Sequence, residues 1–154
     1  MTTPAPVLLP IGQMADATGV KVPTIRYYEQ IGLLPTPPRS QGNRRLYPES
    51  AIQRLRFIRH ARELGFEIDA IRQLLDMADQ PDQSCADADS IARHHLADIQ
   101  SKIARLNALG DEVRRMIVDC SQSSVRQCRV IQVLADHGQC LGDHLAEPIK
   151  INEK

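Results

Sequence analysis

IGQMADATGVKVPTIRYYEQIGLL, residues 11–34, predicts two short helices joined by a tight turn. Gly19 can adopt the left-handed backbone conformation that ends a helix, and Pro23 suits the first turn of the helix that follows. Gly32 ends this second helix after Gln30. Two short helices joined by a glycine-containing turn are the signature of a helix-turn-helix, so we expect a module of that kind here.

Basic residues are concentrated around this helix pair. Between Val20 and Arg62 the sequence has nine basic residues and two acidic ones, whereas the whole chain has 19 of each sign. From Pro81 onward there are nine basic and eleven acidic residues. A basic front half on a balanced back half predicts a polyanion-binding module attached to an assembly module. The second helix adds a face suited to bases and phosphates, made of Thr24, Arg26, Tyr27 and Tyr28.

The segment after the helix pair, LLPTPPRSQGNRRLYP (residues 33–48), is too rich in proline to continue as a helix. We expect a short hairpin, or wing, around Gly42, with residues 44–47 as its return strand. Residues 49–66 then predict a helix, and residues 67–78 predict a further short one. The apolar stripe of the first of these helices consists of Ala51, Leu55, Ile58 and Ala61.

Residues 87–119 contain no proline and a single glycine, so they predict one long helix. Its apolar residues recur at steps of four and three, which is the heptad pattern of a coiled coil with two polar positions. A helix this long at the end of a small module favours pairing with a second chain over burial in one compact core. The seam consists of Ile91, His95, Ile99, Lys102, Leu106, Leu109, Val113, Met116 and Cys120, widened by Ala92, Leu96, Ile103 and Ile117.

Whether the four cysteines are reduced thiols or disulfides depends on the compartment of the protein. No run of about 18 apolar residues could span a membrane. The start of the chain lacks the basic region of a signal peptide, so we expect a disordered lead-in over residues 1–9 and a cytoplasmic protein, in which cysteines stay reduced.

Cys85 and Cys120 are 35 positions apart, about 50 Å along a helix, so they cannot share a metal ion within one chain. The polar residues 121–127, SQSSVRQ, predict a loop between Cys120 and Cys128.

Three motifs in combination, IRYYEQIGLL, GNRRLY and RLRFIRHARELGF, resemble the MerR family of bacterial transcription regulators, over residues 11–130. The resemblance implies a winged helix-turn-helix dimer joined by a long antiparallel coiled coil. It also implies a promoter whose two polymerase-contacting elements are spaced too far apart. Effector binding then makes the protein bend and untwist that DNA, so that RNA polymerase can use it. Lys21-Val22 departs from the family, in which a serine often caps this helix, and the missing cap costs about 1 kcal/mol.

The implied antiparallel dimer also groups the thiols, because the start of one long helix lies beside the end of the other. Cys85 of one protomer then joins Cys120 and Cys128 of its partner, which gives two equivalent metal sites. Soft thiolates favour Zn, Cd, Pb, Hg or Cu(I) over Mg or Ca. A third thiolate adds negative charge that a divalent ion offsets better than Cu(I). The tail could complete this site, form an auxiliary one or be inert; its candidate ligands are His137, Cys140 and His144.

Two features bear on which metal is bound. Copper-sensing members of the family tend to have serine where divalent sensors have Cys85, and Ser84 is adjacent, so a register shift of one residue would change the assignment. Zinc prefers four ligands, and residues 121–127 contain neither His nor a further Cys. The segment around Cys85 resembles the zinc, cadmium and lead branch, and the missing fourth ligand favours cadmium, lead or mercury over zinc.

The sequence therefore predicts a mainly α-helical chain with four parts after the lead-in. These are a winged helix-turn-helix DNA-binding domain (10–80), a dimerisation helix (81–119), a metal-binding loop with a short helix (120–136) and a flexible tail (137–154). The expected metal ligands are Cys85, Cys120 and Cys128. The expected DNA contacts are Thr24, Arg26, Tyr27, Arg39, Arg44, Arg45, Tyr47 and Arg54.

The predicted function is a homodimeric regulator that represses and, on binding a soft divalent metal (Cd, Pb, Zn or Hg), activates genes for metal resistance or efflux by distorting the promoter. Its partners are double-stranded promoter DNA and RNA polymerase, with no membrane. One alternative is a Cu(I) sensor of the same family, and another is a thiol metal-buffering protein, which would not need the basic front half. An iron–sulfur regulator would need four closely placed cysteines. An enzyme is not expected, because no nucleophile and base form a recognisable constellation.

Overall fold

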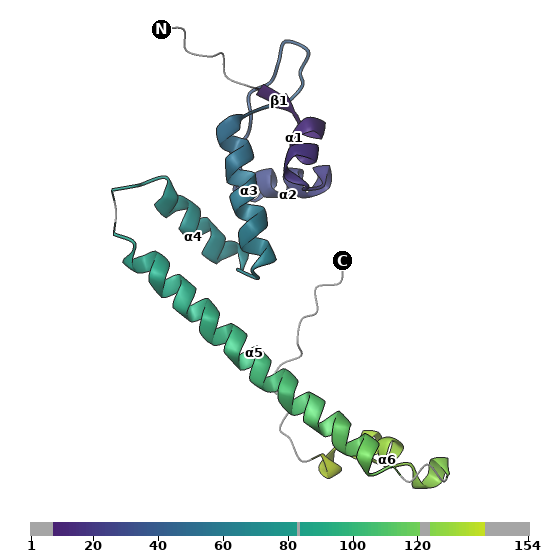
Figure 1. The fold of residues 1–154 in the computed structure, drawn as a ribbon. Coiled ribbons are helices and arrows are strands. Elements are labelled where there is room, and N and C mark those ends of the chain that lie inside the picture. The colour runs from purple at the N-terminus through teal and green to yellow at the C-terminus, as the bar shows by residue number, and fades with distance from the viewer. Residues whose placement is uncertain (1–7, 83, 121–123, 141–154) are drawn as a thin grey trace. The chain divides into compact units, whose positions relative to one another are not determined.

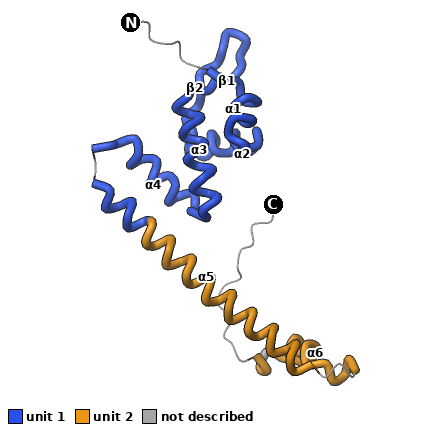
Figure 2. Tube along the Cα trace, viewed as in Figure 1, with its two compact units in different colours: residues 1–91 blue, residues 92–154 orange. Residues whose placement is uncertain are grey.

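The computed structural model of the chain describes residues 8–82, 84–120 and 124–140. Its two compact units are residues 1–91 and residues 92–154 (Figure 2). The helix α5 contributes its first residues to unit 1 and the rest to unit 2. The elements in chain order are β1 (Leu8–Pro10), α1 (Ile11–Thr18), α2 (Val22–Gln30), β2 (Leu46–Pro48), α3 (Glu49–Glu63), α4 (Ile68–Ala78), α5 (Ala86–Val118), the 3-10 turn η1 (Val125–Gln127), α6 (Arg129–Ala135) and the 3-10 turn η2 (His137–Gln139), most of which Figure 1 labels.

The helix-turn-helix lies where the sequence predicts it. Helix α1 ends at Gly19, whose φ of 67° is left-handed and whose N–H donates to the Ala15 carbonyl. A side chain at Gly19 would be strained by this φ and would run into the Arg59 guanidinium. Helix α2 has Pro23 in its first turn, and Lys21 at its N-cap gives no side-chain hydrogen bond, which agrees with the missing serine cap. The turn therefore forms without a side-chain hydrogen bond from the N-cap residue of α2.

The wing is a hairpin that is tied to the start of the chain. An antiparallel bridge joins Arg39 to Arg45, and Asn43 takes the left-handed φ of 59° at the tip. The strand β2 that follows pairs antiparallel with β1, with Leu9 opposite Tyr47. This pairing corrects the expected lead-in over residues 1–9, because Leu8 and Leu9 belong to a strand; the rest of that segment lies outside the described residues. The predicted return strand, residues 44–47, is divided between two elements. Arg45 lies in the bridge, and Leu46 and Tyr47 lie in β2.

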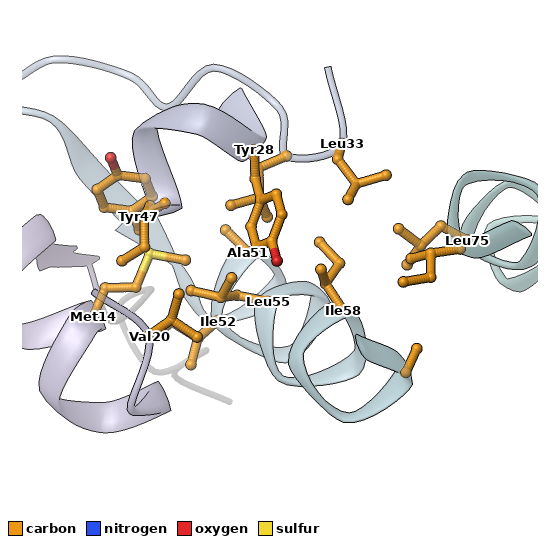
Figure 3. Packing of buried hydrophobic residues seen from close by; sticks show 14 residues of the cluster. Met14, Val20, Tyr28, Leu33, Tyr47, Ala51, Ile52, Leu55, Ile58 and Leu75 are labelled. Atoms are coloured by element: carbon orange, nitrogen blue, oxygen red, sulfur yellow. The ribbon is translucent and has the colours of Figure 1, made fainter. Parts of the chain in front are cut away.

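The core of unit 1 forms where α3 packs against α1, β2 and α4. The predicted stripe of Ala51, Leu55, Ile58 and Ala61 is buried, together with Ile71 and Leu75 of α4 (Figure 3). Tyr28 is also buried, at 8% exposure, which corrects its assignment to a nucleic-acid-binding face. Fully burying a side chain of the Val, Leu, Ile, Phe or Met class stabilises a fold by about 1.5–3 kcal/mol, so this cluster holds α2 on a rigid base.

Helix α5, with 33 residues, confirms the predicted long helix. Many of its large apolar side chains have no cover in one chain: Leu96, Ile103, Leu106, Val113 and Ile117 are each more than half exposed. Near its end, Met116 is buried, as is Val133 of α6. In the described ranges of the chain, no helix has the length and apolar character needed to cross a membrane.

Candidate nucleic-acid interface and metal centre

Four arginines surround a hollow of about 250 Å³ between α2 and the wing. Arg26 comes from α2, and the other three come from the hairpin; the lining consists of Pro10, Ile11, Arg26, Arg39, Asn43, Arg44 and Arg45. At the tip, Arg39 Nη1 donates to Asn43 Oδ1 at 2.7 Å, which holds that guanidinium against the turn. Guanidinium groups on a concave surface suit the oxygens of a phosphate, so the hollow is a candidate contact for a nucleic-acid backbone.

The exposed side of α2 carries the remaining candidates for reading a duplex. Arg26 is exposed and the Tyr27 ring is 50% exposed, while Thr24 is half-buried. A second hollow, of about 380 Å³, lies at the start of α2, and Lys21, Arg59 and Arg62 are among its lining residues. In the sequence these three residues stand out only as basic residues and are not placed at the interface. For Lys21 the sequence did contain a signal, because the predicted turn brings this residue to the start of the second helix.

Tyr47 is corrected from a DNA contact to a buried residue. Its side chain is 0% exposed, and its hydroxyl donates to Glu29 Oε1 at 2.6 Å. Burial first, then the hydrogen bond and the charge of Glu29, raise the pKa of the Tyr47 hydroxyl, against the opposing charges of Arg45 and Arg26. The hydroxyl therefore stays protonated as a donor. Strand β2 alternates its side chains, and the position of Tyr47 faces the core.

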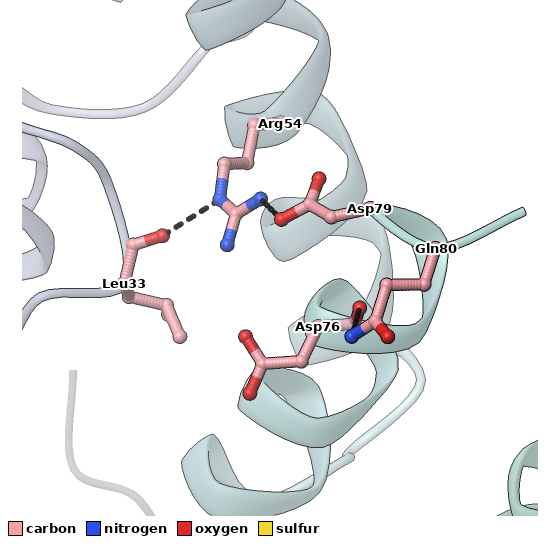
Figure 4. Close-up of polar contacts among 5 residues, drawn as sticks. All are labelled: Leu33, Arg54, Asp76, Asp79 and Gln80. Atoms are coloured by element: carbon pink, nitrogen blue, oxygen red, sulfur yellow. Dashed lines mark hydrogen bonds and ion pairs between the residues drawn. The ribbon is translucent and has the colours of Figure 1, made fainter.

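Arg54 is likewise bonded within the protein. Its Nε donates to the Leu33 carbonyl at 3.0 Å, and its Nη1 donates to Asp79 Oδ2 at 2.8 Å (Figure 4). Gln80 closes the same end of α4 by donating to the Asp76 carbonyl. The guanidinium thus connects the segment after α2 with the end of α4, and its expected DNA contact stays a prediction.

Two of the three predicted metal ligands lie together at the far end of α5. The sulfurs of Cys120 and Cys128 are 4.0 Å apart, and both residues are half-buried. Cys128 is the N-cap of α6. The backbone N–H of Ile131, in the first turn of α6, lowers the pKa of the Cys128 thiol; burial opposes this, and the Cys120 sulfur and the Val130 N–H add to it. The arrangement favours a thiolate, which is the form of cysteine that binds metals.

Cys85, the third predicted ligand, lies at the other end of the long helix. It is exposed and precedes α5, and its carbonyl accepts a hydrogen bond from the Asp89 N–H. The 33 residues of α5 extend about 50 Å between Cys85 and the sulfur pair. Across residues 8–82, 84–120 and 124–140 of a single chain, no three His, Cys, Asp or Glu residues are grouped so as to hold a metal ion.

The auxiliary candidates are placed only in part. Cys140 is half-buried and follows η2, which is held to α6 by a hydrogen bond of 2.6 Å from Arg129 Nη1 to Gln139 Oε1. The side chain of His137, and all of His144, lie outside what the structure describes. The auxiliary site therefore stays a prediction.

Glu29 is a residue that the sequence reasoning did not single out. Its side chain is 8% exposed, its Oε1 accepts a hydrogen bond from the Tyr47 hydroxyl, and its Oε2 lies 3.6 Å from Arg45 Nε. The signal for it was present, because it is one of only two acidic residues between Val20 and Arg62. An isolated acid in a basic segment calls for a specific partner.

Comparisons with known proteins cover both halves of the chain. A family model described as "MerR HTH family regulatory protein" matches residues 9–78, and one described as "MerR, DNA binding" matches residues 52–116. The regulator ZntR of Escherichia coli K12 is 37% identical over 128 residues, which cover 80% of this chain and 90% of ZntR. The mercuric resistance operon regulatory protein of Bacillus cereus is 35% identical over 129 residues, with 80% and 95% covered. The lead(II)-bound structure of the regulator PbrR691 from Ralstonia metallidurans CH34 superposes with a TM-score of 0.74 at 37% identity, covering 82% of this chain and 98% of that one.

Proposed function

Because the chain belongs to the MerR family of transcription regulators, which are not enzymes, we propose that it controls a promoter in response to a soft metal ion. The observation that supports this most strongly is the pair of sulfurs of Cys120 and Cys128, 4.0 Å apart, on a chain whose other end is a winged helix-turn-helix. One end has the chemistry to hold a soft metal, and the other has the charge to hold DNA.

Family members bind promoter DNA and act as dimers. We infer that α5 pairs antiparallel with α5 of a second copy through its exposed apolar seam, and that Cys85 of the partner subunit completes the sulfur pair. The uncovered side chains of Leu96, Leu106 and Val113 support the pairing, because each is more than half exposed in one chain. Each metal site then reports on both chains at once.

The spacing of the two sulfurs bears on the kind of metal. Two sulfurs bound to one tetrahedral ion at about 2.3 Å each lie about 3.8 Å apart, whereas a linear arrangement at the same bond length would separate them by about 4.6 Å. The spacing of 4.0 Å lies between these two values, so both sulfurs can bind one soft metal ion. Relatives named for mercury resistance and a structure bound to lead(II) support a divalent ion over Cu(I).

The regulator acts in the cytoplasm, where thiols stay reduced. Without metal it holds the promoter silent, and with metal it distorts the promoter so that RNA polymerase transcribes genes for metal resistance or efflux. Arg26, Tyr27 and the wing arginines make the DNA contacts, and the phosphate contacts among them make binding weaken steeply with salt.

Two substitutions test whether sensing and DNA binding are separate. The purified dimer is titrated with Zn, Cd, Pb, Hg and Cu(I), following the ultraviolet absorption of thiolate–metal bonds, and promoter binding is measured by mobility shift. Cys120→Ser should lose the metal absorption but still bind DNA, and Arg26→Ala should weaken DNA binding about tenfold with metal binding intact. Cys140→Ser is the control for the tail thiol. Loss of DNA binding in Cys120→Ser would mean that this residue is structural, and a preference for Cu(I) would favour the copper-sensing alternative.

A further inference from the structure

The Glu29 carboxylate lies between the recognition helix and the wing. It is on α2, and its two oxygens reach different residues of the returning wing segment. Oε1 accepts the hydroxyl of Tyr47 at 2.6 Å, and Oε2 lies 3.6 Å from Arg45 Nε. Figure 3 shows the hydroxyl of Tyr47 pointing away from the Met14 side chain beside it. One side chain of α2 thus contacts both Arg45 and Tyr47, which are separated in the sequence by Leu46 alone.

A carboxylate in this position is costly unless its partners compensate for it. Its side chain is 8% exposed, and an ionised group out of water loses hydration that only hydrogen bonds and opposite charge can replace. Tyr47 supplies the hydrogen bond from a fully buried ring, which cannot swing away without opening the core. Arg45 supplies the charge, and its Nε is buried with no hydrogen-bond partner in the described part of the chain. The carboxylate is therefore what keeps this guanidinium in place.

The orientation of Arg45 matters because the same side chain lines the four-arginine hollow. The described lining of that hollow contains no carboxylate, although Glu29 Oε2 lies 3.6 Å from Arg45 Nε. With its Nε held toward Glu29, the Arg45 guanidinium has its other nitrogens available for the hollow, which Arg26 also lines from α2. The pair can present donors to one oxyanion from two elements of the fold.

We propose that Glu29 is a positioning residue for DNA binding, which holds Arg45 and the wing at a fixed place against α2 so that Arg45 and Arg26 bind the same backbone phosphate. This inference rests on the proposed function as a DNA-binding regulator. Glu29 itself does not touch DNA. It acts through Arg45 by charge and through Tyr47 by the hydrogen bond.

The sign of one substitution separates positioning from simple electrostatics. Glu29→Gln keeps the shape of the side chain and its ability to accept the Tyr47 hydroxyl, but it removes the charge that faces Arg45. If charge alone counted, removing a carboxylate beside a polyanion site would strengthen DNA binding. If Glu29 positions Arg45, the same change weakens binding about tenfold and lowers the magnitude of the slope of log K against log salt by about 0.9, the value for one phosphate contact.

The full-length dimer is assayed with a fluorescently labelled duplex over a range of salt concentrations. The variants are Glu29→Gln, Arg45→Ala, the double variant and Tyr47→Phe. Asp69→Asn is the matched control, because Asp69 is an exposed acid on α4 outside the hollow. We expect the double variant to bind no worse than Arg45→Ala, since Glu29 acts through Arg45. Tyr47→Phe, which keeps the buried ring, should weaken binding less than Glu29→Gln and tests the idea even if Glu29→Gln unfolds.

Several results would overturn the inference. They are a Glu29→Gln protein that folds and binds as tightly as the unmodified chain, an unchanged salt slope, or losses in the double variant that simply add. If the Glu29→Gln protein unfolds, unaltered DNA binding by Tyr47→Phe overturns the inference.

The failure of the proposed function looks different. A chain that binds no duplex at all would overturn the proposed function. Salt-dependent DNA binding that only Arg45→Ala weakens would overturn the role of Glu29 and leave the proposed function standing.

Discussion

The two ends of this chain differ in how much of their structure one copy can complete. In unit 1 the helices and wing share one buried cluster, and Tyr47, Arg54 and Glu29 find their partners inside the chain. In the described part of unit 2, the buried side chains are Glu112, Met116 and Val133, and most of the large apolar residues of α5 are open to water. The DNA-binding end thus completes its core within one chain, whereas α5 leaves most of its large apolar side chains uncovered, as the proposed pairing with a second chain requires.

This difference suits the dimeric regulator proposed above. A finished DNA-binding unit holds its side chains in place whether or not metal is present. A metal site that needs a thiol from each chain has no such independence, since its formation requires the helices of both subunits to be correctly paired. Metal binding is then coupled to the pairing of the two chains.

The largest expected effect comes from a heterodimer that breaks the assembly at chosen positions. One chain carries Cys85→Ser, and the other carries Cys120→Ser with Cys128→Ser. If sites form across the dimer, one site has no thiol and the other has three, because the intact Cys85 meets the intact pair. If each chain builds its own site, one site lacks one thiol and the other lacks two. X-ray absorption at the metal edge counts the sulfurs.

The parental homodimers provide the controls for this experiment. In the cross-dimer arrangement neither parent has a three-sulfur site, while the purified heterodimer has one. A heterodimer without any three-sulfur site would show that Cys85 does not belong with Cys120 and Cys128 of the partner, and the comparison between the two ends of the chain would lose its main support.

The second prediction tests the self-contained end. Leu55 of α3 is 0% exposed, so Leu55→Ala should lower the opening free energy of unit 1 by about 2–5 kcal/mol, the range for a leucine truncated in a packed core. Hydrogen exchange of the α3 amides measures this loss. The loss should be independent of protein concentration, because the cluster around Leu55 lies within one chain. A loss that varied with concentration would mean that unit 1 depends on the dimer.

The third prediction applies the same substitution to the incomplete end. Leu106 of α5 is 54% exposed in one chain, so truncating it removes little that a single copy has buried. We expect it to lie in the seam of the paired helices. Leu106→Ala should then weaken the dimer by about 1.5–3 kcal/mol, because two copies each lose about half of the value for burying such a side chain. Sedimentation equilibrium measures the dissociation constant. An unchanged dissociation constant would place the seam elsewhere on α5.

The sequence was sufficient for elements whose signals are local. The turn at Gly19 and the long helix α5 need only their neighbours in the chain, and both are confirmed. The strand β1 was missed, because Leu8 and Leu9 become a strand only through pairing with residues almost 40 positions away. For the site, the sequence named the two sulfurs that lie 4.0 Å apart.

Residue types alone were misleading where burial decides the role. Tyr28 and Tyr47 have side chains that suit DNA contacts, and both are instead buried within unit 1. Burial depends on how distant elements pack, which periodicity in one segment does not specify. The position of Cys85 beside the sulfur pair depends on a second chain and stays a prediction, which the heterodimer tests.

The smallest effect concerns a purely local feature of the DNA-binding end. Lys21 at the N-cap of α2 has the extended backbone of a capping residue but gives no side-chain hydrogen bond. Lys21→Ser supplies a cap, yet Pro23 has no N–H, so the serine oxygen can be used only by the Thr24 N–H, which already donates to the Lys21 carbonyl at 2.9 Å. We expect a gain of about 0.5–1 kcal/mol in the stability of unit 1, at the low end for an N-cap. Lys21→Ala is the matched control, because it removes the same charge without adding a cap. Thermal melting compares the two variants, and equal melting temperatures would mean that the turn leaves the new hydroxyl no free donor. Both variants should lose the same DNA affinity, since each removes one positive charge from the hollow at the start of α2.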